Sequence, residues 1–135
     1  MAVILVVEDN KNTQLLTATR LKPYFEVVCA DDGLDALDVF YSRHVDLVIS
    51  DIMMPNMDGF ELLQRIRSEG FNTPVLLLTA KVAMQDKREG FNLGTDESFH
   101  ADNGRNSARG YYISAHAPQF RHLSISVFKN IFNKN

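Results

Sequence analysis

The sequence predicts an α/β fold, in which helices cover both faces of a doubly wound parallel β-sheet. Three observations support this prediction. The chain has 135 residues, about the length of one domain; 45% of these residues are hydrophobic; and short apolar runs alternate with helical patterns. Strands that alternate with helices form parallel sheets, and strands covered on both faces lack polar alternation. We therefore expect one globular domain.

The first two strand–helix units occupy the first third of the chain. The run from Val3 to Val7 is apolar throughout and predicts a central strand, and residues 11–21 predict a helix that ends before Pro23. Residues 25–30 predict the second strand and residues 33–41 the second helix. The apolar positions of the first helix are Leu15, Leu16 and Leu21. Those of the second, on or near one helical face, are Leu34, Leu37, Val39, Phe40 and Tyr41.

Two further units complete the predicted sheet. Residues 45–50 predict the third strand, and Asp58 is placed as the N-cap of a helix that begins at Gly59. Residues 75–78 predict a fourth buried strand, and residues 82–89 a fourth helix with a weaker pattern. The apolar positions of the third helix are Phe60, Leu62, Leu63 and Ile66.

Acidic side chains follow two of these predicted strands. Glu8 and Asp9 come after the first strand, Asp51 follows the third, and Thr79 follows the fourth. The carboxyl ends of parallel strands share one edge of the sheet, so we expect these residues to converge there. Two carboxylates about 5 Å apart repel by roughly 3 kcal/mol at an effective dielectric constant of 20. A fold tolerates that repulsion when a cation binds between them, and all-oxygen ligation favours Mg²⁺.

The same residues carry a family resemblance. The acid pair Glu8 and Asp9, the block 51–59 (Asp-Ile-Met-Met-Pro-Asn-Met-Asp-Gly), and the runs 78–81 (Leu-Thr-Ala-Lys) and 94–97 (Gly-Thr-Asp-Glu) resemble the receiver domain of two-component response regulators. This resemblance covers about residues 2–97. It implies a flavodoxin-like receiver fold with its core in residues 1–97 and a signalling role rather than metabolic catalysis.

The resemblance also implies a role for each site residue. Asp51 is expected to be the phosphoacceptor, which takes a phosphoryl group from a phosphohistidine of a sensor histidine kinase. Asp9 and Asp51 are expected to ligate Mg²⁺ directly, Glu8 largely through water, and Met53 through its carbonyl oxygen. Thr79 is expected to be the switch hydroxyl that hydrogen-bonds the new phosphoryl group.

The residues leave alternative interpretations open. A lone Asp after a strand often caps a turn or a helix. A second function is a phosphorylation-deficient interaction module, which binds a kinase or another receiver without switching. A third is a small Mg²⁺-dependent phosphohydrolase, which is disfavoured because Met53 stands where a second acid would follow Asp51 by two residues.

The family pattern breaks after residue 97. Ser98 stands where the family has an aromatic residue, Ala101 where it has a lysine, and Asp102 where it has a proline. Residues 1–97 carry 16 of the 17 acids, whereas residues 98–135 carry 1 acid and 5 of the 14 bases. We therefore treat 98–135 as a divergent C-terminal segment. One hypothesis is a shift of reading frame near Ser98; the other is a divergent terminus with its own fold.

The divergent segment predicts an atypical fifth strand and helix. Residues 102–110 form a polar pattern with no helical stripe, residues 111–113 predict a short strand, and an apolar face lies between 125 and 132. Loss of the regular fifth strand and helix is expected to bare one edge of the sheet and part of a face, with tail packing, homodimerisation or plain instability as the outcome. The five bases are too scattered to favour direct DNA binding.

Other features of the chain predict a cytoplasmic protein with no output domain of its own. A run of about 18 apolar residues, as a membrane span needs, is missing, and the N-terminus lacks the basic start of a signal peptide. The length leaves no space for a second domain beside the receiver core.

Overall fold

The computed structural model describes residues 1–80, 97–100 and 109–114, and within these it contains one six-stranded sheet. The strand order is β2-β1-β3-β4-β6-β5. The strands are β1 (Val3–Val7), β2 (Glu26–Ala30), β3 (Leu47–Asp51), β4 (Val75–Ala80), β5 (Glu97–His100) and β6 (Arg109–Ser114). The helices are α1 (Lys11–Leu21), α2 (Gly33–Ser42) and α3 (Gly59–Ser68). The fourth predicted helix, residues 82–89, lies outside the described residues.

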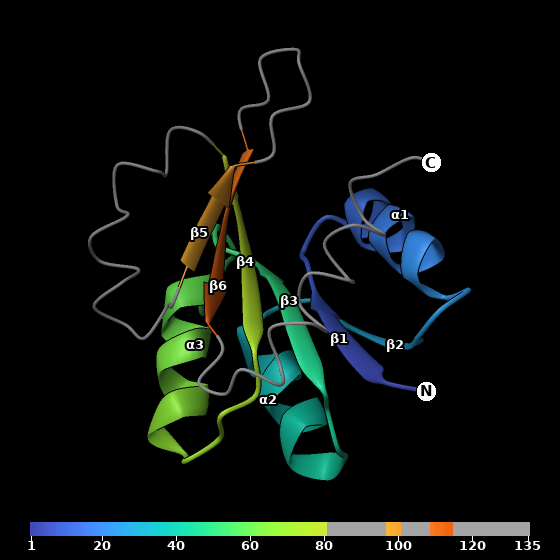
Figure 1. Cartoon of the computed structure of the whole chain (residues 1–135). Coiled ribbons are helices and arrows are strands. Elements are labelled where there is room, and N and C mark those ends of the chain that lie inside the picture. The colour runs from blue at the N-terminus through green and yellow to red at the C-terminus, as the bar shows by residue number, and fades with distance from the viewer. Residues whose placement is uncertain (81–96, 101–108, 115–135) are drawn as a thin grey trace.

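The first four strands confirm the predicted parallel sheet. β1 pairs with both β2 and β3, and β3 pairs with β4, all in parallel. All five residues of β1 are buried, as its unbroken apolar run predicts. Helices α2 and α3 pack against each other on one face of this sheet, and α1 lies on the other face (Figure 1). This arrangement is the doubly wound receiver fold expected from the sequence.

Helix α1 buries only one of its three predicted apolar positions, Leu21. Its buried residues are Gln14, Ala18 and Leu21, which follow each other at helical spacings of four and three. Leu15 is 62% exposed and Leu16 is 53% exposed. Apolar character alone favours burial of the two leucines, whereas the face of α1 that packs against the sheet contains a buried polar residue, Gln14.

Only part of the apolar face predicted for α2 is buried. Leu37 and Phe40 are buried at a spacing of three, and they join the core formed with α3. Leu34 and Tyr41 are about half exposed, because they lie beside this stripe rather than within it. None of the helices in the described residues has the length and hydropathy that crossing a membrane requires.

The C-terminal strands complete the sheet in an antiparallel manner. β6 pairs antiparallel with β4, from Val75 opposite Ser114 to Ala80 opposite Arg109, and β5 pairs antiparallel with β6. This confirms the short strand predicted around Tyr112. β6, which belongs to the C-terminal segment, covers the edge of β4 with a backbone ladder, so part of this segment compensates for the missing regular fifth strand. The predicted apolar face in residues 125–132 lies outside the described residues.

Candidate metal centre

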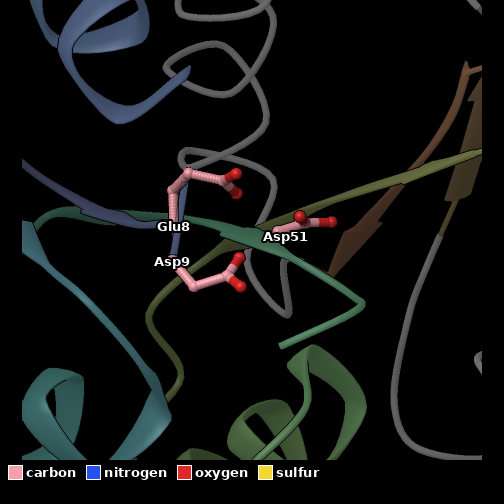
Figure 2. Close-up of side chains that lie close together, drawn as sticks. All are labelled: Glu8, Asp9 and Asp51. Atoms are coloured by element: carbon pink, nitrogen blue, oxygen red, sulfur yellow. The ribbon is translucent and has the colours of Figure 1, made fainter. Parts of the chain in front are cut away.

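The three predicted acids come together at one edge of the sheet. Glu8 and Asp9 follow β1 directly, and Asp51 is the last residue of β3. β1 and β3 are parallel neighbours with Val7 opposite Ser50, so their carboxyl ends meet. One carboxylate oxygen from each acid lies within 4.8 Å of the others, and Figure 2 shows the three side chains grouped at the strand ends. The predicted convergence of these acids is therefore present.

The three carboxyl groups differ in their exposure to solvent. Glu8 is only 8% exposed, Asp51 is half-buried and Asp9 is exposed. Burial raises the pKa of the Glu8 carboxyl to about 8, and the hydrogen bond and charge of Asp51 and the charge of Asp9 raise it further in the same direction. Glu8 therefore retains its proton at neutral pH unless a cation enters the cluster.

This donor set fits Mg²⁺. All three side chains offer hard oxygen ligands, and Mg²⁺ commonly binds one or two carboxylates together with water and phosphate oxygens. A divalent cation would offset the negative charge of the three carboxylates and would favour the ionised form of Glu8. Glu8, Asp9 and Asp51 are thus the described residues that would hold the ion.

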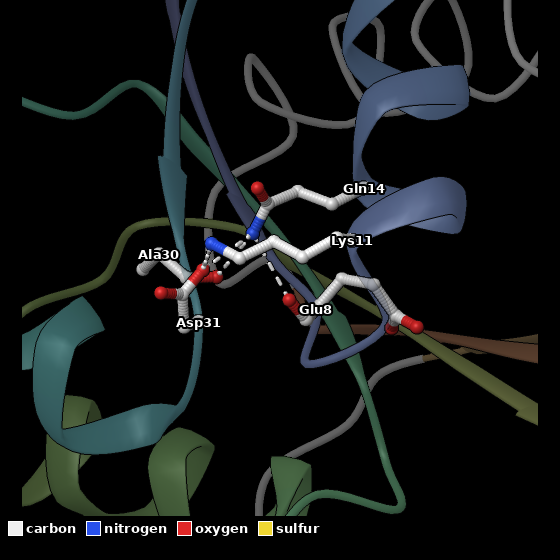
Figure 3. A network of polar contacts seen from close by, with 5 residues as sticks. All are labelled: Glu8, Lys11, Gln14, Ala30 and Asp31. Carbon is white, nitrogen blue, oxygen red and sulfur yellow. Dashed lines mark hydrogen bonds and ion pairs between the residues drawn. The ribbon is translucent and has the colours of Figure 1, made fainter.

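The loop after β1 is fixed by the N-cap residue of α1 and by one polar residue within the helix. The Asn10 side chain caps the helix by accepting a hydrogen bond from the Thr13 amide at 3.0 Å. The buried Gln14 amide donates to the carbonyl oxygens of Glu8 and Ala30, each at 3.0 Å (Figure 3). Gln14 is a site residue that was not predicted from the sequence. Its signal was a polar residue at helical spacing from Ala18, on the stripe that is otherwise apolar.

The loop between β3 and α3 is also tied in place. Asn56 has a φ of 67°, a left-handed conformation that asparagine tolerates better than most residues. Its side-chain amide donates to Asp32 at 3.2 Å, and Asp58 caps α3 by accepting from the Glu61 amide at 2.8 Å. The predicted N-cap role of Asp58 is confirmed.

Gly59 allows α3 to begin close to the end of β3. A Cβ atom at this position would lie 2.5 Å from the Asp51 carbonyl oxygen and 2.9 Å from the Ile52 Cα. The Gly59 amide also donates to the Ile52 carbonyl at 2.8 Å. A side chain here would push against the backbone that carries Asp51, so glycine is required for this approach.

Met53 lies beside Asp51 on the loop that follows β3. Its backbone amide is 3.4 Å from the Asp51 Oδ1 atom, and its side chain is exposed. The main chain of Met53 therefore lies next to the acid cluster. The contribution of its carbonyl oxygen as a metal ligand stays a prediction.

β4 brings one further predicted residue, Thr79, to the same edge, and β6 adds a residue that was not predicted there. Leu78 is opposite Asp51, so the backbone of Thr79 lies one residue farther toward that edge. β6 is antiparallel and places Arg109 opposite Ala80, which brings a basic residue to the carboxyl end of β4. Ala101, the position of the missing lysine, lies outside the described residues. The switch role of Thr79 stays a prediction.

Comparisons with known proteins agree with this geometry. A family model described as "Response regulator receiver domain" matches residues 4–101. The sensor histidine kinase RcsC of Escherichia coli is 41% identical over 95 residues, which is 70% of this chain and 10% of that protein. The chain thus spans about a tenth of the length of this curated relative.

Solved structures of receiver proteins are similar in fold to this chain. The receiver domain of the Francisella response regulator 1452 has a TM-score of 0.69 and 25% identity, with full coverage of both chains. The Thermotoga maritima response regulator TrrA, solved in complex with Mg(2+)-BeF, has a TM-score of 0.64 and 28% identity, with 96% of this chain and 99% of that chain covered. By its fold, its acid cluster and its match to the family model, this chain belongs to the response regulator receiver domain family of two-component signalling.

Proposed function

We propose that this protein is a phosphoacceptor, in which Asp51 takes a phosphoryl group from a phosphohistidine of a sensor histidine kinase. The observation that carries this proposal is the convergence of Glu8, Asp9 and Asp51, whose carboxylate oxygens lie within 4.8 Å of one another. Three acids at the carboxyl edge of a parallel sheet are costly to hold together, and a metal-dependent transfer to one of them explains why they are there.

The proposed reaction moves one phosphoryl group between two side chains. A carboxylate oxygen of Asp51 attacks phosphorus, so that an oxygen–phosphorus bond forms as the nitrogen–phosphorus bond to the kinase histidine breaks. The electron pair of that bond stays on the imidazole nitrogen, which takes up a proton. Mg²⁺, when bound, would supply positive charge to offset the negative charge of the crowded oxygens.

Each remaining site residue has a proposed task. Asp9 and Asp51 hold the ion directly, Glu8 acts largely through water, and the Met53 carbonyl oxygen adds a ligand. Thr79 hydrogen-bonds the phosphoryl group through its hydroxyl. The position of its backbone, one residue past the row shared by Asp51 and Leu78, supports this task.

The comparisons support the choice of partner and ion. A relative at 41% identity is named as a sensor histidine kinase, and a receiver of similar fold was solved with Mg(2+)-BeF. We propose that a sensor histidine kinase is the phosphoryl donor, that the encounter takes place in the cytoplasm, and that Mg²⁺ is the cofactor. The chain then acts as a signalling domain, with self-catalysed phosphorylation and dephosphorylation as its only turnover.

Incubation with acetyl phosphate and Mg²⁺, followed by intact-mass measurement, tests the proposal. We expect one added phosphoryl group on the wild type, and none on Asp51→Asn or on wild type treated with a metal chelator. Asp38→Asn is the matched control, because Asp38 is an exposed acid of α2 away from the site, and this variant should be phosphorylated as the wild type is.

The other outcomes identify the competing functions. A folded wild type that gains no phosphoryl group at saturating Mg²⁺ would contradict the proposal and favour a module that only binds its partners. Repeated turnover of small phosphate esters without a retained adduct would favour a phosphohydrolase.

A further inference from the structure

We propose that Gln14 is a positioning residue for the acid pair, and that it sets the affinity of the site for Mg²⁺ without touching the ion. This inference rests on the proposed magnesium site. Gln14 lies within α1 and is not one of the three acids that would hold the ion.

Gln14 is buried, and its side-chain nitrogen donates to three acceptors. It is 8% exposed, although glutamine is usually found at the surface. Its side-chain nitrogen donates to the Glu8 carbonyl at 3.0 Å, the Ala30 carbonyl at 3.0 Å and the Asp31 carboxylate at 3.1 Å. A primary amide has two hydrogens, so these three acceptors use its full donor capacity. Such a residue connects the ends of β1 and β2 to α1.

The first of these bonds holds the peptide on which the acid pair depends. The carbonyl of Glu8 and the amide of Asp9 belong to one planar peptide group, so fixing the carbonyl oxygen fixes the plane between the two acids. On the other side of Glu8, its own amide donates to the Ala30 carbonyl at 3.0 Å. Both peptides that flank Glu8 are therefore anchored, one of them by Gln14.

The network also includes a nearby cationic side chain. Lys11 forms an ion pair with Asp31, which also accepts from Gln14 (Figure 3). The neighbouring Asp32 accepts from Asn56 at 3.2 Å, which links this network to the loop after Asp51. Gln14 thus orients the acid pair with a neutral donor, which adds no positive charge that would compete with a metal ion.

Residues that orient metal ligands by hydrogen bonds, without touching the metal, have a measurable effect on metal affinity. Their loss lowers metal affinity by about 10-fold to 100-fold in known metal sites. Gln14→Met keeps a long, unbranched side chain of good helix propensity and removes the donors. We expect this variant to bind Mg²⁺ about 10-fold more weakly than the wild type.

The experiment measures Mg²⁺ binding directly, by calorimetric titration of the metal-free protein. The matched control is Gln64→Met, the same substitution at an exposed position of α3, which should bind Mg²⁺ as the wild type does. In the metal-free variant, hydrogen exchange should accelerate at the amides of Asp9 and Asn10 but not in β3. The phosphorylation rate of Gln14→Met should recover at saturating Mg²⁺.

Other results would overturn the inference. If Gln14→Met is folded and binds Mg²⁺ within about 2-fold of the wild type, Gln14 has no positioning role. If that variant does not fold, Gln14→Asn, whose amide is one methylene short of the carbonyls, takes its place and is expected to bind more weakly, while unchanged binding would again overturn the inference. A wild type that binds no Mg²⁺ would instead overturn the proposed function.

Discussion

The two parts of the sheet differ in how they relate to the acid cluster. β1 to β4 are parallel, and the ends of β1 and β3 deliver all three acids. β6 and β5 are antiparallel additions that cover the edge of β4 and supply none of them. The parallel strands alone therefore bring the three acids together. The antiparallel part contributes backbone pairing and, through Arg109, a basic residue at the same edge.

The largest expected effect tests the core of the parallel part. Leu37→Ala removes a side chain that is 6% exposed, and Leu34→Ala removes one that is 51% exposed, from the same helix. We expect a loss of about 3 kcal/mol in the free energy of unfolding for Leu37→Ala and less than about 1 kcal/mol for Leu34→Ala, measured by chemical denaturation. Equal losses would contradict the burial of α2 described above.

A smaller effect is expected from the antiparallel part. β6 has a strand on each side, so Tyr112→Pro removes a ladder donor and leaves an acceptor in a neighbouring strand unpaired. We expect a loss of about 2 kcal/mol in the free energy of unfolding. Phosphorylation of Asp51 should persist in the folded fraction, because the acids lie on other strands. Unchanged stability would show that β6 does not pair in this way.

A smaller effect still concerns pH in the metal-free protein. The pKa of Glu8 is about 8 in the folded state and 4.5 for an ordinary glutamate. The folded state therefore binds more protons between these two values, and stability falls as pH rises from about 5 to 8. We expect a lower midpoint of thermal unfolding at pH 8 than at pH 5 in the presence of a chelator.

Glu8→Gln serves as the control for this pH effect. The variant cannot ionise at position 8, so its loss of stability between pH 5 and pH 8 should be smaller than that of the wild type. Because Mg²⁺ competes with the proton on Glu8, added Mg²⁺ should stabilise the wild type more at pH 8 than at pH 5. A wild type and a Glu8→Gln variant with the same pH dependence would contradict the raised pKa.

The sequence predicted the parallel part of the fold because its signals are local. β1 is an unbroken run of buried apolar residues, and Asp58 is a helix cap directly before Gly59. The convergence of Glu8, Asp9 and Asp51 followed from the rule that parallel strands end at one edge. These features need no knowledge of distant contacts.

What the sequence did not predict depends on long-range packing. Leu15 and Gln14 are neighbours on α1, and only the orientation of the helix against the sheet decides that the polar residue is buried and the apolar one exposed. The antiparallel pairing of β6 with β4 joins residues more than 28 positions apart, such as Ala80 and Arg109. We propose residue 97 as the boundary of the receiver core, and the coding sequence tests the hypothesis of a shifted reading frame after it.

The most direct test of the central claim locates the phosphoryl group on the chain. After incubation with acetyl phosphate and Mg²⁺, borohydride reduces an aspartyl phosphate to homoserine, which tandem mass spectrometry assigns to one position. The account predicts homoserine at position 51, only when Mg²⁺ is present and only after phosphorylation. Homoserine at another aspartate, or equal labelling of position 51 without Mg²⁺, would contradict it.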